Sequence, residues 1–409
     1  MSQPSPHLSS QRLANLAAAF GTPTYVYDLD MVRQRASQLR AAIAHAPCQL
    51  LYAIKANPCP ALVTCLLDEG FGIDAVSPGE MHLALRLGCP PERLCYTENN
   101  MTDDEQRDAL AQGVMINCGS LQRLQALAAV GAGEVAVRFN PDVGASEHAH
   151  TLTAGPLTKF GVHHSQIDQV LAIEAQYDIQ VVGCHMHIGS NVLDAQHFAQ
   201  AMRVILSVAK ALPNLRWLDV GGGLGVPYHG DQQPIDLSAV GAAATAMMQE
   251  LEAHHGRSIQ LRLEPGRFLV AEAGTLLTTV TTIKTNPDGR CFVGCDSGFN
   301  HLLRPTMYGS YHPISNISAP DAPEQTVDVV GNICESGDIF ARDRVLPRPQ
   351  INHVLAIGCA GAYGMSMASV YNLRPLPAEV VLDGSATAVV RQRLSVDDLL
   401  AHSFPSLTE

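Results

Sequence analysis

Several side chains that can do chemistry stand directly after short apolar runs of this 409-residue chain. The first is Lys55, which follows the run at residues 50–54. A lysine in that position is either a surface side chain whose stem covers apolar neighbours or an amine held in a cleft for covalent chemistry. Because lysine is seldom buried, Lys55 taken alone favours the surface interpretation.

A second apolar run ends in His185 and His187, with Gly189 and Ser190 close behind. Alternation along a strand places the two imidazole rings on the same face. A zinc-binding pair is one interpretation, but no carboxylate or cysteine has the spacing that would complete a zinc site. The other interpretation is a ring that stacks on a flat cofactor.

A glycine-rich stretch at residues 221–225 follows the run at residues 218–220. Consecutive glycines let backbone N–H groups approach a phosphate closely. The pattern matches neither the dinucleotide-binding fingerprint nor a P-loop. An ordinary tight turn explains this stretch equally well when it is taken by itself.

Glu264 and Arg267 follow the last apolar run of this series and are separated by Pro265 and Gly266. Such a couple is commonly a structural ion pair. In a binding site, the carboxylate would suit a protonated ring nitrogen and the guanidinium would suit a ligand that carries a carboxylate.

These residues together supply an amine, a flat ring, a phosphate cradle and an acid. Pyridoxal phosphate is the cofactor that requires all four. Each group by itself has an ordinary structural explanation, so it is their joint occurrence at strand ends that favours a pyridoxal-phosphate site.

The elements expected to position these residues alternate between short apolar strands and amphipathic helices from about residue 24 to residue 270. The expected strands are residues 49–54, 72–75, 94–96, 115–118, 134–138, 179–186, 217–220 and 260–263. The expected helices between them are residues 60–69, 79–87, 103–111, 120–129, 165–176, 195–212 and 237–255. Eight such strands predict a (β/α)8 barrel, in which chemistry occurs at the carboxyl ends of the strands. A doubly wound open sheet is the alternative, because alternation cannot show closure.

After residue 272 the pattern changes to short β runs separated by Pro, Gly and Asn. The expected strands are residues 275–283, 291–294, 326–330, 353–357 and 378–382. These runs predict a second, mostly antiparallel β domain.

Composition excludes several classes of protein. The net charge is −13, and nucleic-acid partners are not expected because phosphate binding requires clustered Lys and Arg. The eleven cysteines are scattered without Cys-x-x-Cys pairs, which predicts reduced thiols in a cytoplasmic protein and no metal site. The uncharged stretch 354–373 has the length of a membrane span, but its glycines and polar residues favour a buried strand and loop. No membrane association or secretory signal is expected.

The residues above belong to a longer series of motifs that runs in order along nearly the whole chain. The motifs are residues 52–57, 74–80, 138–141, 159–161, 185–190, 221–228, 264–267, 304–308, 334–338 and 361–364. In this series the chain resembles the alanine-racemase-like (fold type III) pyridoxal-phosphate decarboxylases, and among them the diaminopimelate decarboxylases most closely.

This resemblance implies a barrel that binds pyridoxal phosphate (residues 30–272), a C-terminal β domain (273–409) and an N-terminal segment (1–29) that joins the β domain. It also implies a homodimer whose active sites are shared across the interface. The activity implied is decarboxylation of the small-molecule substrate meso-diaminopimelate to L-lysine.

The resemblance also assigns roles to single residues. Lys55 corresponds to the lysine that forms the Schiff base, His187 to the stacking ring, and Cys334 to the residue that reprotonates the carbanion from the neighbouring subunit. Glu264 would face the pyridine nitrogen, and Tyr363 would reach both phosphate and substrate. The positions that match the family's cofactor site are Lys55, Asp74, His187, Ser190, Gly222, Gly223, Glu264, Gly266, Arg267 and Tyr363.

The far end of the substrate would be bound by Arg267, Arg304, Tyr308, Glu335 and Tyr363. Two guanidinium groups suit a carboxylate, and a carboxylate suits an ammonium group. One departure from the family pattern is Asn191, where glutamine is usual.

Two other functions are compatible with the same residues. One is a decarboxylase of a related amino acid, such as a siderophore or secondary-metabolite precursor, a D-amino acid, ornithine or lysine. The other is a non-catalytic pyridoxal-phosphate carrier, against which the β domain argues because such proteins usually consist of the barrel alone.

Overall fold

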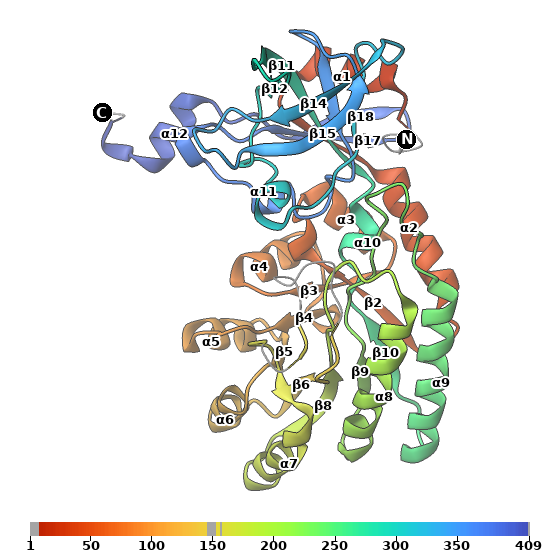
Figure 1. The fold of residues 1–409 in the computed structure, drawn as a ribbon. Coiled ribbons are helices and arrows are strands. Elements are labelled where there is room, and N and C mark those ends of the chain that lie inside the picture. Colours follow the sequence, from red (N-terminus) through yellow and green to blue (C-terminus); the bar gives the residue numbers. More distant parts are fainter. Residues whose placement is uncertain (1–7, 145–152, 156–157, 408–409) are drawn as a thin grey trace. The chain divides into compact units, whose positions relative to one another are not determined.

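The computed structural model describes residues 8–144, 153–155 and 158–407 of the chain (Figure 1). Internal contacts divide the chain into two units. The barrel unit comprises Arg33–Val226 and Gln233–Phe268, and the β unit comprises Met1–Val32, Pro227–Gln232 and Leu269–Glu409. Both units are therefore discontinuous in sequence, and the short segment Pro227–Gln232 belongs to the β unit although it lies between two parts of the barrel.

Parallel strands form a closed ring in the barrel unit (Figure 1). The strands, in ring order, are β2 (Cys48–Ala53), β3 (Gly72–Ala75), β4 (Leu94–Thr97), β5 (Met115–Cys118), β6 (Glu134–Asn140), β8 (Gln180–His185), β9 (Trp217–Asp219) and β10 (Gln260–Leu263). β5 pairs with β6, and β10 pairs with β2, so the ring has no free edge; the short β7 (Val162–His163) adds to β6. The prediction of a (β/α)8 barrel is confirmed, and the doubly wound open sheet is excluded.

Helices lie outside this ring of strands (Figure 1). They are α2 (Leu29–Ala42), α3 (Pro60–Asp68), α4 (Pro78–Arg86), α5 (Asp103–Ala111), α6 (Leu121–Ala129), α7 (Ile167–Gln176), α8 (Ala195–Ala211), α9 (Leu237–His255) and the single turn α10 (Arg267–Val270). Side chains of Ser77, Thr102, Ser120 and Asp236 accept hydrogen bonds from the first turns of α4, α5, α6 and α9. Each cap of this type contributes about 1 kcal/mol.

The barrel strands are buried because the ring and the helices cover them. All four residues of β3 and β4 are buried, as are the last four of β2. This burial on both faces is why these strands appear in the sequence as continuous apolar runs rather than alternating ones. A charged residue at the end of such a run is therefore conspicuous.

The β unit is built on a mixed, mostly antiparallel sheet. Its elements are α1 (Ser10–Phe20), β1 (Thr24–Asp28), β11 (Gly274–Thr285), β12 (Cys291–Cys295), α11 (Arg304–Tyr308), β13 (Ile314–Asn316), β14 (Glu324–Val330), β15 (Ile339–Pro347), β16 (Val354–Ile357), β17 (Ala378–Asp383), β18 (Ala386–Arg391) and α12 (Val396–Ser403). The main strand order is β15-β14-β12-β11-β1-β17-β18. Among the described strands of this unit, only the β1–β17 and β12–β14 pairings are parallel. The second, mostly antiparallel domain predicted from the sequence is confirmed.

In the β unit, the described strands that were not predicted are β1, β13, β15 and β18. β1 is the most informative, because it lies in the middle of the sheet between β11 and β17, whose residues are about 250 and 350 positions away. Leu13 and Leu16 of α1 are part of a buried cluster with Val26 of β1 and Val380 of β17.

The uncharged stretch 354–373 forms β16 and then a loop with two short 3-10 turns. Within residues 8–144, 153–155 and 158–407, no helix is both long and apolar enough to cross a membrane. All eleven cysteines lie in the described ranges and are free thiols.

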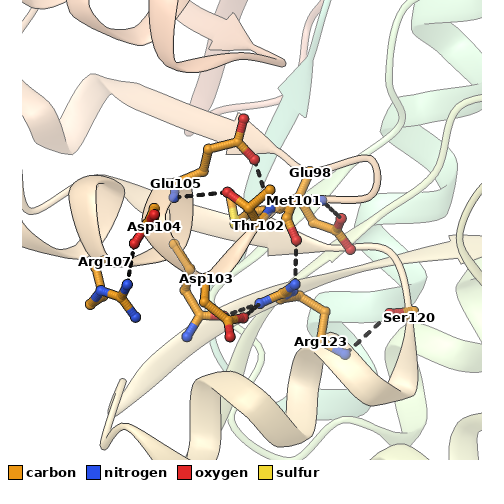
Figure 2. A network of polar contacts seen from close by, with 10 residues as sticks. Glu98, Met101, Thr102, Asp103, Asp104, Glu105, Arg107, Ser120 and Arg123 are labelled. Carbon is orange, nitrogen blue, oxygen red and sulfur yellow. Dashed lines mark hydrogen bonds and ion pairs between the residues drawn. The ribbon is translucent and has the colours of Figure 1, made fainter.

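A polar network ties together the loops that follow β4 and β5 (Figure 2). Glu98, directly after β4, accepts hydrogen bonds from the backbone N–H groups of Gly119 at 2.7 Å and Met101 at 3.3 Å. Arg123 of α6 donates to Asp103 and to the carbonyl of Met101. These residues and Gln106, a further acceptor for Arg123, are called the capping network below.

Candidate active site

Lys55 lies at the carboxyl end of β2, in a single 3-10 turn (Ile54–Ala56). Its Nζ donates to Oδ2 of Asp74 on the neighbouring strand β3 at 2.6 Å. Asp74 is completely buried, whereas about one third (32%) of the Lys55 side chain is exposed. Burial, followed by the charge of Glu264, raises the pKa of the Asp74 carboxyl, and Lys55 opposes that rise. Lys55 is therefore an amine that faces a buried carboxylate rather than a side chain lying along the surface.

Glu264 and His185 form a second buried pair. Nε2 of His185, the last residue of β8, lies 2.9 Å from Oε2 of Glu264, which follows β10. The two side chains are 1% and 3% exposed. Burial by itself would raise the pKa of Glu264, but His185, and then Lys55, outweigh it and hold that pKa at about 2. Glu264 is thus an ionised carboxylate inside the barrel.

Asp219, at the end of β9, and Arg138, two residues before the end of β6, add two further charged groups. Asp219 ends β9, and its Oδ1 accepts from the backbone N–H of Gly221 at 2.7 Å. Burial, and then the charge of Glu264, raises the pKa of Asp219 well above its usual range. The guanidinium of Arg138, on β6, lies 4.7 Å from the ring centroid of Phe160.

His187 and the glycine stretch lie against each other. Nδ1 of His187 accepts from the backbone N–H of Gly222 at 3.1 Å. Burial, and then the charges of Arg138 and Lys55, holds the pKa of His187 well below its usual range, so the ring is neutral at pH 7. A neutral imidazole can lie against a flat ring without placing a charge on it.

The glycine stretch passes so close to the backbone of neighbouring segments that side chains would not fit there. A Cβ at Gly222 would lie 2.1 Å from the carbonyl oxygen of Glu264, and one at Gly223 would lie 2.6 Å from that of Gly189. Gly223 also has a φ of +99°. Ser190, the residue after Gly189, accepts a hydrogen bond at its Oγ from Nη2 of Arg267 at 2.8 Å. This bond joins the segments that follow β8 and β10.

Four buried polar atoms of this region have no hydrogen-bond partner among the described residues. They are Oδ1 of Asp74, Nη2 of Arg138, Nδ1 of His185 and Oε1 of Glu264. An unsatisfied buried polar atom costs about 1–3 kcal/mol, so proteins seldom leave several together unless a ligand pairs with them. Acceptors and donors beside the Lys55 amine and the glycine stretch fit pyridoxal phosphate, which has a ring nitrogen, a ring hydroxyl and a phosphate.

The remaining predicted site residues belong to the β unit. Arg304, the first residue of α11, is 2% exposed, and its Nη1 lies 3.0 Å from Nε2 of His312. The guanidinium is also stacked 4.6 Å from the ring centroid of Tyr228. Tyr308 ends the same helix and is half-buried.

Cys334 and Glu335 are exposed on a loop whose backbone is held in place by hydrogen bonds. The backbone N–H of Cys334 donates to Oδ1 of Asn372 at 3.0 Å. The Asp338 carboxylate accepts from the N–H groups of Phe299 at 2.6 Å and Ile333 at 2.7 Å. The loop therefore presents a thiol and a carboxylate to its surroundings on a defined backbone.

Tyr363 is half-buried and has a φ of +55°, a conformation that non-glycine residues seldom adopt. Backbone outliers of this kind often mark functional positions. Tyr363, Arg304, Tyr308, Cys334 and Glu335 all belong to the β unit, whereas the other predicted site residues belong to the barrel unit.

Comparison with known proteins agrees with this geometry. Residues 29–271 match the family described as pyridoxal-dependent decarboxylase, pyridoxal binding domain. Over 397 residues the chain is 43% identical to the diaminopimelate decarboxylase of Methanothermobacter thermautotrophicus, covering 94% of this chain and 92% of that protein.

Solved structures give the same result. A crystal structure of a diaminopimelate decarboxylase matches with a TM-score of 0.92 at 32% identity, covering 98% of this chain and 99% of the other. The diaminopimelate decarboxylase of Helicobacter pylori, solved in complex with L-lysine, matches with a TM-score of 0.89 at 32% identity, covering 96% and 100%.

The chain belongs to the diaminopimelate decarboxylase family. Its barrel is a pyridoxal-binding domain of the pyridoxal-dependent decarboxylases.

Sequence reasoning assigned no role to Arg138 and Asp219, and it considered His185 only together with His187, as a zinc pair or a stacking ring; all three lie in this decarboxylase barrel. The signal that pointed to Lys55, a charged residue at the end of a buried strand, applies equally to Arg138 and Asp219. The acidic partner of His185 could not be recognised from spacing, because Glu264 is 79 residues further along the chain. The 2.9 Å separation of that pair is a hydrogen-bond distance.

Asn191, the departure from the pattern of the diaminopimelate decarboxylases, has a structural explanation. It is buried, has a φ of +56°, and its Oδ1 accepts from the backbone N–H of Val226 at 2.9 Å. Asparagine tolerates a left-handed backbone better than most residues. Its shorter side chain thus anchors the chain at Val226, at the end of the glycine stretch.

Proposed function

We propose that the chain is a pyridoxal-phosphate-dependent decarboxylase that converts meso-diaminopimelate to L-lysine and carbon dioxide. The observation that carries the proposal is the set Lys55, Asp74, His185 and Glu264, which combines an amine with buried polar atoms that lack partners among the described residues. Its relatives support the choice of substrate, because they are diaminopimelate decarboxylases and one was solved with L-lysine.

Pyridoxal phosphate, when bound, supplies the electron sink for the carbon that loses carbon dioxide. Lys55 is the amine that holds it covalently, and Asp74 keeps that amine directed into the barrel. His187 would cover one face of the ring. Glu264 would hold the proton on the ring nitrogen, because an anionic neighbour favours the charged form of a base.

The phosphate group would be bound at the glycine stretch. Gly222 and Gly223 carry no side chain, the N–H of Gly222 donates to Nδ1 of His187, and Gly266 lies against Ala53 and Ala56 beside Lys55. Ser190 and Arg267 add a hydroxyl and a guanidinium. Tyr363 would also bind this group.

Cys334 would return a proton to the carbon that loses carbon dioxide. A thiol is a suitable general acid near neutral pH. Cys334 is exposed on this chain, which suits a residue offered to the active site of a second copy. We therefore infer a homodimer with shared sites, and the free cysteines are those expected of a cytoplasmic enzyme.

The far amino-acid group of the substrate would be recognised by Arg267, Arg304, Tyr308, Glu335 and Tyr363. Arg304 is held in one place by His312 and by the ring of Tyr228, so its guanidinium loses little freedom on binding a carboxylate. Glu335 supplies the anion that an ammonium group needs.

The experiment is product analysis with the purified chain and added pyridoxal phosphate. We expect meso-diaminopimelate to yield lysine of the L configuration, with one carbon dioxide released per lysine. L-lysine, L-ornithine and D-amino acids serve as competing substrates in the same assay. Preference for one of them would leave a pyridoxal decarboxylase with a different substrate, whereas no turnover of any amino acid by a cofactor-loaded protein would favour the carrier function.

A further inference from the structure

Three carboxyl groups meet inside the barrel, although the cofactor's ring nitrogen needs only one of them as an anion. Asp74, Asp219 and Glu264 come from β3, the end of β9 and the residue after β10, and all are buried. The closest oxygens of Asp219 and Glu264 lie within 4.8 Å of each other and of a ring nitrogen of His185. Like charges at such distances in a dry interior repel strongly, so something must decide which group ionises.

His185 contacts this cluster from a fixed position. It is the last residue of β8 and lies opposite Asp219 in the strand register. The next residue, Met186, donates its N–H to the carbonyl of Asp219 at 3.0 Å, so the backbone is fixed on both sides of the ring. The ring itself is 1% exposed and therefore has no room to turn away.

The two oxygens of Glu264 have different surroundings. Oε2 lies 2.9 Å from Nε2 of His185. Oε1 is buried and has no partner among the described residues. The hydrogen bond at Oε2 fixes the orientation of the Glu264 carboxylate. Oε1 is then the oxygen that a ligand would contact.

We propose that His185 is a positioning residue for the cofactor: by donating Nε2–H to Oε2 it orients Glu264, keeps Oε1 available for the pyridine nitrogen, and makes Glu264 rather than Asp74 or Asp219 the anion of the cluster. This inference rests on the proposed function, because it concerns how this chain prepares Glu264 for pyridoxal phosphate.

The directions of the pKa shifts of the three carboxyl groups agree with Glu264 being the anion of the cluster. Burial and the charge of Glu264 raise the pKa values of both Asp74 and Asp219, whereas the pKa of Glu264 is lowered. Burial acts on all three, so the difference comes from specific neighbours. For Glu264 the largest favourable neighbour is His185; for Asp74 it is Lys55.

The alternative is that His185 and Glu264 are only a structural pair that stabilises the barrel. Loss of such a pair would lower thermal stability, and catalysis would fall only as the folded fraction fell. A positioning role makes a different prediction, because the protonation state of the bound cofactor would change in protein that remains folded.

The test uses three substitutions at His185 that differ in whether the new side chain can donate a hydrogen bond to Oε2 of Glu264. His185→Gln keeps an N–H donor near the position of Nε2. His185→Asn carries an amide too short to reach Oε2, and His185→Leu removes the donor. His45→Gln is the matched control, because His45 is a buried histidine of the same unit whose Nε2 lies 3.2 Å from the carbonyl oxygen of Ile259.

The primary measurement is the 15N chemical shift of holoenzyme loaded with pyridoxal phosphate labelled at the ring nitrogen, which reports directly whether that nitrogen is protonated. We expect the wild type, His185→Gln and His45→Gln to give the protonated shift. His185→Leu and His185→Asn should move towards the unprotonated shift. In those two variants kcat should fall roughly ten- to a hundredfold, while KM changes by less than about threefold, because the lost contact acts on the cofactor and not on substrate binding.

The outcomes are distinguishable. A wild-type shift and kcat in both His185→Leu and His185→Asn would overturn the role of His185 and leave the proposed function intact. A wild-type enzyme with an unprotonated ring nitrogen would remove the proposed role of Glu264, and this inference with it. If His185→Leu does not fold, His185→Asn, which keeps a polar group in the cavity, provides the same comparison with His185→Gln.

Discussion

Two polar networks stand at the carboxyl ends of the barrel strands, and they differ in how completely they are paired. In the capping network, of which Figure 2 labels Glu98, Met101, Asp103 and Arg123, both oxygens of Glu98 accept backbone N–H groups, and Arg123 has three acceptors. In the cluster of Lys55, Asp74, His185 and Glu264, three buried atoms have no partner among the described residues. Polar groups that satisfy one another hold loops, whereas those left unsatisfied are available to a ligand.

The two charged clusters have similar residue composition, and it is the difference in hydrogen bonding that distinguishes them. Each contains carboxylates and cations near the ends of neighbouring strands. In the capping network, both oxygens of Glu98 and both terminal nitrogens of Arg123 are hydrogen-bonded to the protein, so its loss should reduce stability and not chemistry. The five predictions below test that distinction, from the largest expected effect to the smallest.

Substitution of Lys55 should have the largest effect. Lys55→Ala removes the amine that is proposed to hold the cofactor, so turnover should fall by at least about a thousandfold. Borohydride treatment of the loaded variant should no longer fix the cofactor to the protein, as measured by mass spectrometry. Cofactor still fixed by borohydride in Lys55→Ala would sink the assignment of this lysine.

The second prediction tests whether Cys334 acts on a second copy of the chain. Cys334→Ala alone should be nearly inactive. Mixing it with Lys55→Ala under conditions of subunit exchange should restore up to about a quarter of wild-type activity, since half of the dimers are mixed and each contains one complete site. Confirmed mixed dimers without activity would mean that Cys334 serves its own subunit or is not the proton donor.

Arg304→Ala should change specificity and leave cofactor binding nearly unchanged. A charge-assisted contact is worth about 1.5–3 kcal/mol, so kcat/KM for meso-diaminopimelate should fall roughly ten- to a hundredfold. Lysine and ornithine, which lack the far carboxylate, should lose little. Equal losses for all substrates, together with a lower melting temperature, would instead identify Arg304 as a structural residue.

Glu98→Gln tests the capping network. The amide keeps the size of the side chain but turns one acceptor into a donor that faces a backbone N–H group, which should cost about 1–3 kcal/mol of the free energy of unfolding. The kcat of the folded, loaded enzyme should be unchanged. Asp103→Asn is the control, because Asp103 is 76% exposed and its substitution should change stability by no more than about 0.5 kcal/mol. A fall in kcat at unchanged stability would move Glu98 into the active site.

The smallest effect is expected for Asp219→Asn, and it should depend on pH. The pKa of Asp219 is raised on folding, so this group disfavours the folded state increasingly as pH rises above the ordinary carboxyl range. Asparagine keeps the acceptor for the Gly221 N–H and has no proton to lose. In denaturant unfolding without cofactor, the variant should be more stable than the wild type at pH 8, and the difference should disappear towards pH 4. A difference that is constant with pH would exclude titration of Asp219 as its cause.

The sequence by itself determined the barrel strands, and it indicated most of the residues that are proposed for the pyridoxal site. Each barrel strand is an apolar run covered on both faces, so its bounds could be predicted to within about two residues. Lys55 and Glu264 were recognisable because a charged residue at the end of such a run is rare. The family resemblance added residues, such as Cys334, whose surroundings in sequence have no such signal.

Only the tertiary structure decided what depends on pairing between distant segments. Closure of the ring rests on the β5–β6 and β10–β2 contacts, and no local pattern records which strands pair. β1 escaped prediction because its partners are hundreds of residues away. The hydrogen bond of His185 to Glu264, and the atoms left without partners beside it, likewise follow from how the strands are arranged, because satisfaction of a buried polar atom is a property of its three-dimensional neighbours.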